Sequence, residues 1–252
     1  MKKVIAFDLD DTLAVTKSPI SDRMAELLTK LVEKYDVCVI SGGKFEQFEK
    51  QVVERLDIPH HLLNKLHLMP TCGTRYYRYD ELDKKWAMQY ADDIDPAQRA
   101  EIARVLEEEA RKIGLWDTKV WGDRIEDRFS QVTYSALGQQ APPEEKYNWT
   151  KKHLKEKMEL RDAVALRLPN FEVRANGASS IDVTNYGIDK GYGMTKLIEA
   201  IEVSRDEILF IGDKLDEGGN DYPVKAMGID TISVEGWEDT AFVIEGILGV
   251  TR

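Results

Sequence analysis

The sequence predicts an α/β protein in which a Rossmann-like core with a parallel sheet carries an inserted α+β domain. Three observations predict this fold class. Short apolar runs alternate with helical patterns near both ends of the chain, polar signatures follow three of those runs, and the middle of the chain has a different pattern. With 252 residues, the chain is long enough for a core and an insert.

The first elements alternate between strand and helix. Residues 4–7 form an apolar run typical of a buried strand, and residues 37–40 form a second one. Between them, Ser21 can cap a helix whose apolar residues recur at three- and four-residue steps: Met24, Leu27, Leu28 and Leu31. Strand, helix and strand in this order predict a parallel α/β unit.

The same order returns near the end of the chain. Residues 193–201 have a helical pattern, residues 208–211 form an apolar run that ends at Gly212-Asp213, and residues 231–234 predict a further strand. We therefore expect residues 1–85 and 186–252 to build one core.

The middle segment, residues 86–185, reads as the inserted α+β domain. A long charged helix is expected from Pro96 to about residue 112, and Pro142-Pro143 introduces a second helix that reaches about residue 159. Alternating stretches at residues 125–137 and 171–183 predict strands.

Composition excludes several classes of protein. Thirty-five basic and 46 acidic residues give a net charge of −11, which disfavours nucleic acid as a partner. No apolar stretch approaches the ~20 residues of a membrane span, and the N-terminal residues lack the pattern of a secretory signal, so we expect a cytoplasmic protein. The two cysteines and four histidines have no metal-ligand spacing, and we expect the histidines at the surface or its boundary.

Polar signatures follow three of the predicted strands. They contain Asp8, Asp10 and Thr12 after the first strand, Ser41 after the second, and Asp213 followed by Asp221 after a third. If these strands are parallel, their carboxyl ends lie at one edge of the sheet, where ligands of open α/β sheets bind. Carboxylates without histidine or cysteine suit Mg²⁺, which binds carboxylates together with phosphate oxygens. Phosphoryl transfer is the leading hypothesis.

These motifs, together with Lys190, resemble the four signature motifs of the haloacid dehalogenase superfamily. The inserted segment resembles the C2-type α+β cap, and the pattern is most similar to the eukaryotic-type phosphomannomutase branch, including Gly218-Gly219-Asn220-Asp221. The resemblance implies that Asp8 is the nucleophile and Asp10 the general acid and base. It also implies that Thr12, Ser41 and Lys190 hold the phosphoryl group, while Asp8, the Asp10 carbonyl, Asp213 and Asp221 bind or support Mg²⁺.

The resemblance is incomplete in the residues that would contact the rest of the substrate. Arg128 matches an arginine that grips a distal phosphate, whereas Gln139, Lys146 and Lys17 stand where further arginines are expected. Ser180 and Asp182 match positions that contact the sugar. The resemblance also makes a homodimer through the cap an expectation.

Two enzymatic hypotheses therefore stand side by side. The first is a phosphosugar phosphatase on a phosphomannomutase-like scaffold. Fewer arginines in the predicted distal site favour a substrate with a single phosphate, which water then attacks. The second is a phosphomannomutase that interconverts mannose 1-phosphate and mannose 6-phosphate. A third hypothesis, from another class, is a non-catalytic module that binds a phosphosugar.

Overall fold

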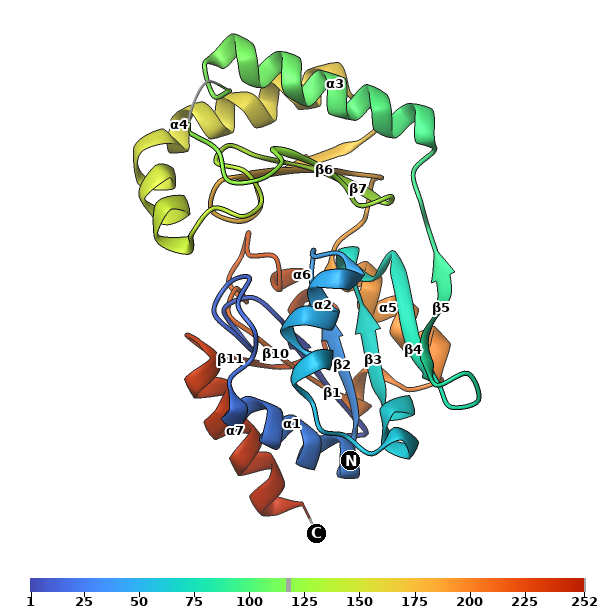
Figure 1. The fold of residues 1–252 in the computed structure, drawn as a ribbon. Helices are drawn as coiled ribbons and strands as arrows, with labels where there is room; N and C mark the ends of the chain where they lie inside the picture. The colour runs from blue at the N-terminus through green and yellow to red at the C-terminus, as the bar shows by residue number, and fades with distance from the viewer. Residues whose placement is uncertain (117–118, 252) are drawn as a thin grey trace. The chain divides into compact units, whose positions relative to one another are not determined.

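The structure, a computed structural model, describes residues 1–116 and 119–251 and divides into two compact units (Figure 1). One unit, which we call the core unit, consists of Met1–Ala91 and Asp189–Arg252. The other, the inserted unit, consists of Asp92–Ile188. Each unit has its own sheet and its own apolar core.

The core unit is built on a seven-stranded sheet with the order β11-β10-β1-β2-β3-β4-β5. Its strands are β1 (Val4–Asp8), β2 (Asp36–Ile40), β3 (Leu66–Met69), β4 (Arg75–Asp80), β5 (Lys85–Ala91), β10 (Ile208–Gly212) and β11 (Asp230–Ser233). Strands β11, β10, β1, β2 and β3 pair in parallel, whereas β4 and β5 form an antiparallel extension. The three strands followed by the predicted polar signatures, β10, β1 and β2, are neighbours, so their carboxyl ends share one edge.

Alternation along the central strands fixes the layers of the core unit. Ile5 and Phe7 pack in one apolar cluster with α1 (Asp22–Lys34), α2 (Phe45–Gln51) and α7 (Trp237–Val250). Val4 and Ala6 point to the other face and pack with α5 (Lys190–Ile201) and α6 (Tyr222–Ala226). The core unit is thus a three-layer α/β/α structure, and it agrees with the predicted Rossmann-like core.

A local signal explains where helix α1 begins. Helix α1 starts after Ser21, whose hydroxyl accepts a hydrogen bond from the Met24 amide at 3.3 Å, as expected for an N-cap. Four short 3₁₀ turns complete the unit: η1 (Val53–Arg55), η2 (His60–Lys65), η3 (Thr71–Gly73) and η4 (Arg205–Glu207).

The inserted unit is an α+β structure with a four-stranded antiparallel sheet in the order β6-β7-β9-β8. Its elements are α3 (Pro96–Ile113), β6 (Ile125–Asp127), β7 (Gln131–Ser135), α4 (Pro143–Arg167), β8 (Glu172–Arg174) and β9 (Ser180–Thr184). Val132, Tyr134 and Ile181 lie in the apolar cluster with residues of α3 and α4. The alternate positions, among them Thr133 and Asp182, carry polar side chains on the opposite face of the sheet.

Several elements differ from the sequence-based expectations. Strands β3, β4 and β5 lie in a stretch for which the apolar pattern predicted no strand, and the antiparallel β4 and β5 make the sheet mixed rather than wholly parallel. Strand β5 belongs to the core sheet, whereas the expected boundary at residue 85 left most of it in the insert. The expectation that all histidines lie near the surface is wrong for His67, which lies in the fully buried strand β3, where its ring bonds the Tyr76 hydroxyl at 2.7 Å.

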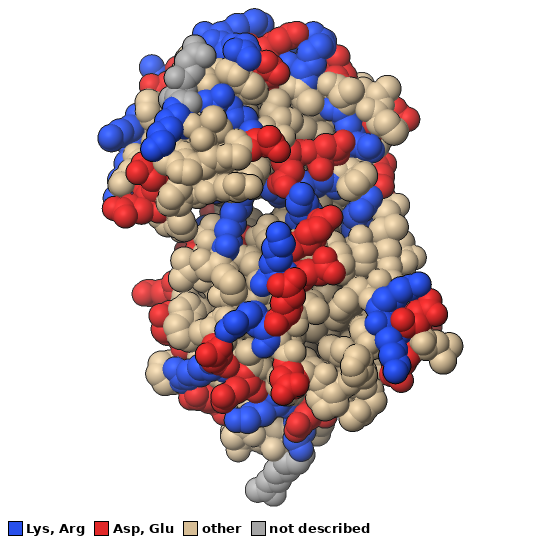
Figure 2. Space-filling view, in the orientation of Figure 1, with Lys and Arg blue, Asp and Glu red and all other residues tan. Residues whose placement is uncertain are grey.

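The described helices include none that is both long and apolar enough to cross a membrane. On the face seen in Figure 2, basic and acidic side chains are interspersed in both units. This mixture agrees with the absence of a run of lysines and arginines from the sequence.

Candidate active site

The site begins at the end of β1, where a carboxylate follows four apolar residues. All five residues of β1 are buried, and Asp8, the last of them, is 3% exposed. Its Oδ1 accepts a hydrogen bond from the Leu9 amide at 2.7 Å. After Asp8 the chain turns through Asp11, whose φ is 62°, and the Asp11 carboxylate accepts bonds from the amide and hydroxyl of Thr16. The turn therefore holds Asp8 at the carboxyl edge of the sheet.

Lys190 bridges two carboxylates at this edge. It is the first residue of α5 and is 1% exposed. Its Nζ lies 2.6 Å from Asp8 Oδ1 and 2.5 Å from Asp221 Oδ1. An ammonium at this depth is retained because two carboxylates contact it directly.

The loop after β10 brings two further carboxylates to the site. Asp221 is fully buried, and its Oδ2 accepts a bond from the Lys214 amide at 3.0 Å. Gly212 makes this approach possible, since a Cβ at that position would lie 2.4 Å from Asp221 Oδ2. Asp213 contacts the Lys214 ammonium through Oδ2 at 2.6 Å.

The cluster has more negative than positive groups, because Asp8, Asp213 and Asp221 face Lys190 and Lys214. Burial raises the pKa of the Asp8 carboxyl to about 8; the Lys190 charge opposes that rise, and the carboxylates of Asp221 and Asp213 add to it. Burial alone would lower the pKa of Lys190, but the charges of Asp8 and Asp221 raise it above its ordinary range. The raised pKa of Asp8 shows that this cluster disfavours a third ionised carboxylate, and a bound cation would favour that ionised form.

The donor set of this cluster fits a divalent cation. One oxygen from each of Asp8, Asp213 and Asp221 lies within 4.8 Å of the others. Asp213 Oδ1 is buried and has no hydrogen-bond partner among the described residues, which is costly for a carboxylate oxygen unless a cation binds it. Oxygen donors of this type suit Mg²⁺ rather than a soft metal.

The remaining predicted residues of the core unit surround this cluster. Asp10 accepts hydrogen bonds from the Lys17 amide at 2.7 Å and from Gln47 Nε2 at 3.3 Å. The Thr12 hydroxyl is buried and makes no hydrogen bond to another described residue, and Ser41 is buried directly after β2. The Lys17 side chain is exposed, and its backbone amide donates to Asp10 Oδ1.

The predicted residues of the inserted unit are held by partners within that unit. Arg128 is 7% exposed and its guanidinium lies 2.8 Å from Glu126 Oε2. The Lys146 ammonium donates to the Gln139 carbonyl at 3.1 Å. Asp182 accepts a bond from the Thr133 hydroxyl at 2.8 Å, while Ser180 begins β9. Arg128 also donates to Gln139 Oε1 at 3.4 Å, so Arg128, Gln139 and Lys146 lie together in this unit.

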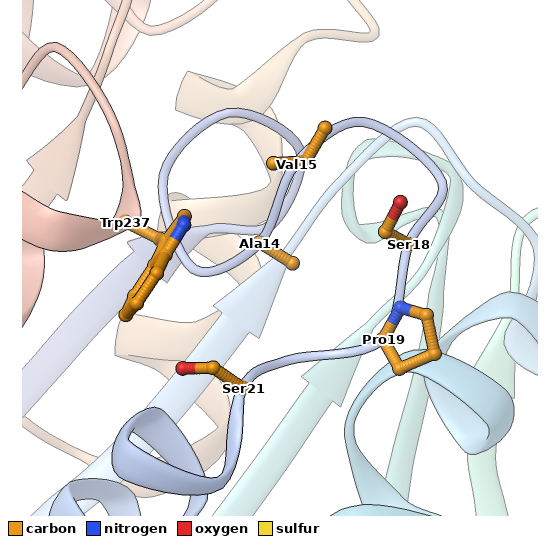
Figure 3. Close-up of a pocket in the computed structure, with 6 residues that line it drawn as sticks. All are labelled: Ala14, Val15, Ser18, Pro19, Ser21 and Trp237. Carbon is orange, nitrogen blue, oxygen red and sulfur yellow. The ribbon is translucent and has the colours of Figure 1, made fainter. Parts of the chain in front are cut away.

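A hollow of about 250 Å³ lies beside the loop that follows Thr12 (Figure 3). Its lining consists of apolar and hydroxyl side chains: Ala14, Val15, Ser18, Pro19, Ser21 and Trp237. Because this lining has no carboxylate or amine, the hollow offers no acid, base or metal ligand, and the chemistry belongs to the carboxylate cluster.

Sequence reasoning assigned no role to two residues that contact the candidate site. Gln47 reaches Asp10 from α2, and Lys214 contacts Asp213. Lys214 adjoins a predicted motif and could have been found there. Gln47 gave only a weak signal, because a glutamine on a short helix is ordinary.

Comparisons with known proteins agree with this geometry. The family model of haloacid dehalogenase-like hydrolases matches residues 5–223. A phosphomannomutase from Encephalitozoon cuniculi is 25% identical over 246 residues, which cover 95% of this chain and 91% of the relative. Among solved structures, a haloacid dehalogenase-like hydrolase from Bacteroides thetaiotaomicron has a TM-score of 0.65 at 19% identity, covering 98% of this chain and 100% of that one. The Plasmodium falciparum IMP-nucleotidase has a TM-score of 0.70 at 15% identity, with 99% and 69% covered.

The chain belongs to the haloacid dehalogenase-like hydrolases, since the family model spans most of its length. Its structural neighbours share the fold. The family and its phosphomannomutase relatives identify the chain as an enzyme of the phosphatase or phosphomutase type, and the hypothesis of a non-catalytic binding module is not supported.

Proposed function

We propose that this member of the haloacid dehalogenase-like hydrolases is a Mg²⁺-dependent phosphatase that hydrolyses a phosphorylated sugar through an aspartyl phosphate. One observation carries the proposal: Asp8 is buried at the carboxyl edge of the sheet, in contact with Lys190 and within one cluster with Asp213 and Asp221.

Asp8 is the proposed nucleophile. Its contacts with Leu9 and Lys190 both fall on Oδ1, so we assign Oδ2 to the attack on phosphorus. A bond forms between Oδ2 and phosphorus while the bond from phosphorus to the sugar oxygen breaks. Asp10 gives that oxygen a proton, and later takes a proton from the water that attacks phosphorus and releases inorganic phosphate, which restores Asp8.

The other residues of the core unit orient the phosphoryl group and balance its charge. Lys190 supplies a fixed positive charge, and the hydroxyls of Thr12 and Ser41 donate to the equatorial oxygens, because phosphoryl transfer depends on positioning and electrostatics. Asp8, Asp213 and the Asp10 carbonyl would hold Mg²⁺, with Asp221 in support. When bound, the ion neutralises charge on the transferring group.

The charges in the inserted unit favour hydrolysis of the phosphate ester over the phosphomutase reaction. A mutase must bind a phosphate at each end of its substrate, which calls for strong cationic contacts away from the nucleophile. Here Arg128 is already paired with Glu126, and Gln139 is neutral. We assign Arg128, Lys146, Ser180, Asp182 and Lys17 to contacts with the sugar and its outer groups.

Phosphomannomutase is the second candidate, supported by the phosphomannomutase relative that covers nearly the whole chain. Phosphorus NMR with Mg²⁺, mannose 1-phosphate and a trace of hexose 1,6-bisphosphate separates the two. Accumulation of inorganic phosphate is expected; appearance of mannose 6-phosphate without net phosphate release would instead establish the mutase.

A cytoplasmic location and a homodimer formed through the inserted unit are further parts of the proposal, and they rest on the sequence pattern and the resemblance. Analytical ultracentrifugation of the full chain tests the dimer. A molecular mass equal to that of one chain would contradict it.

A further inference from the structure

Two glutamines on α2 link the acid–base candidate to the loop that follows it. Gln47 and Gln51 are four residues apart, so their side chains lie on the same face of the helix. Helix α2 begins two residues after Ser41-Gly42-Gly43, and it therefore lies next to the end of β2.

The amide nitrogen of Gln47 donates in two directions. It lies 3.3 Å from Asp10 Oδ2 and 2.9 Å from Gln51 Oε1. A primary amide has two N–H groups, so both contacts can be made at once. Since the Lys17 amide binds the other oxygen of Asp10 at 2.7 Å, both carboxylate oxygens have a fixed donor.

Gln51 links this arrangement to the loop that contains Ser18 and Ile20. It is 3% exposed, and its Nε2 donates to the Ser18 carbonyl at 2.9 Å. Its own backbone carbonyl accepts from the Ile20 amide at 2.9 Å. The glutamine thus binds the loop that carries Lys17, the second donor to Asp10, and a part of this loop is visible in Figure 3.

A glycine leaves room for the contact. A Cβ at Gly43 would lie 2.4 Å from Gln47 Oε1, so the Gln47 amide packs directly over the Ser41-Gly42-Gly43 loop. Asp10 and the loop after β2 are consequently tied to one side chain.

We propose that Gln47, supported by Gln51, is the positioning residue that orients the Asp10 carboxylate for proton transfer. This role rests on the proposed function, in which Asp10 protonates the departing sugar oxygen. An amide that donates to one carboxylate oxygen limits rotation about the Cβ–Cγ bond, and proton transfer is efficient only over hydrogen-bond distance and in line.

The leaving group of the substrate provides the test. A sugar oxygen is a poor leaving group and requires the proton from Asp10, whereas p-nitrophenolate departs with little help from an acid. We expect Gln47→Leu and Gln47→Glu to lower kcat/KM for the sugar phosphate by about tenfold, and for p-nitrophenyl phosphate by less than about threefold. Gln47→Glu keeps the shape of the side chain, but its ionised form cannot donate, so a residue that only packs would tolerate it better than Gln47→Leu.

Gln89→Leu is the matched control, because Gln89 is an exposed glutamine of the same unit whose amide donates only locally, to the Ala87 carbonyl. Equal losses with both esters, or no loss in either Gln47 variant, would overturn the positioning role. A crystal structure of Gln47→Leu gives a second measurement. More than one rotamer of Asp10 is expected, and a single unchanged rotamer would contradict the positioning role.

Failure of the proposed function has a different signature. It would appear as turnover of both esters by Asp8→Asn, or as no turnover by the unaltered protein. Equal losses in the Gln47 variants, with an inactive Asp8→Asn, would reject only the inference about Gln47.

Discussion

Both units of this enzyme contain buried lysines, and two of these, Lys190 and Lys157, have opposite surroundings. Lys190 in the core unit is 1% exposed and lies between the carboxylates of Asp8 and Asp221. Lys157 in the inserted unit is 4% exposed, and its ammonium donates to backbone carbonyls of Ala175, Gly177 and Ala178. Burial lowers the pKa of Lys157 to about 8, an effect that the charge of Asp182 opposes, whereas the pKa of Lys190 is raised.

The difference separates the effect of burial on the pKa of a lysine from the effect of nearby carboxylates. Removal from water disfavours the ammonium in both places. Only in the core unit do carboxylates at direct contact reverse the effect, so Lys190 is a permanent charge suited to a phosphoryl group. The contacts of Lys157 are those of a structural residue that ties α4 to the loop before β9.

The largest expected effect is that of Asp8→Asn. An amide of the same shape cannot accept the phosphoryl group, so turnover should fall at least about a thousandfold. Phosphate release is measured with Mg²⁺, and circular dichroism checks the fold. Unchanged activity would remove Asp8 from the mechanism.

Lys190→Met tests the comparison directly. We expect turnover to fall by about a hundredfold, because a fixed charge at the phosphoryl group is lost. The free energy of unfolding should also fall, by about 3 kcal/mol, since two buried carboxylates lose their common partner.

Lys157→Met is the matched variant of the other unit, and its kcat should stay within about threefold of that of the unaltered protein. A loss of turnover as large as that of Lys190→Met would contradict the structural role of Lys157.

The pH dependence of stability sharpens the same comparison. With a folded pKa of about 8 for Lys157 and an unfolded one of about 10.4, the unfolded state binds more protons between these values. Stability should therefore rise with pH across this interval, by about 2 kcal/mol relative to Lys157→Met. Urea unfolding of both proteins from about pH 7.5 to 10 measures the difference. A difference that does not vary with pH would show that the three carbonyl contacts fully offset burial.

The smallest effect is expected for a charge added to the inserted unit. Gln139→Arg should raise the affinity for a hexose bisphosphate by about fivefold, because a guanidinium can bind a phosphate through two hydrogen bonds. Isothermal titration in the Asp8→Asn background measures binding without turnover. The exposed neighbour Gln140→Arg is the control, and equal affinities of the two variants would exclude Gln139 from the distal site.

The core motifs could be predicted from the sequence because each depends on residues that are close together in the chain. A buried parallel strand is a continuous apolar run, and a carboxylate at its end has few alternatives to the sheet edge. The order β10-β1-β2 then brings Asp8 and Asp213 together, as the pattern suggested. In contrast, β4 consists of tyrosines and charged residues, and its pairing with β5 depends on contacts that the apolar pattern does not contain.

The details of the inserted unit could not be predicted for a related reason. Lys157 lies in a charged stretch of α4 that reads as a solvated helix face, and its burial depends on a loop about twenty residues away. The hydrogen bond from Arg128 to Gln139 joins residues eleven positions apart. Partners chosen by tertiary packing leave little trace in local sequence.

The central claim is that Asp8 becomes phosphorylated during turnover. The most direct measurement is to quench the enzyme during turnover of a sugar phosphate, reduce with borohydride, and map the peptides by mass spectrometry. Because borohydride converts an acyl phosphate to an alcohol, homoserine is expected at position 8 in the unaltered protein and should be absent from Asp8→Asn. Reduction at another carboxylate, or none during active turnover, would contradict the aspartyl-phosphate mechanism.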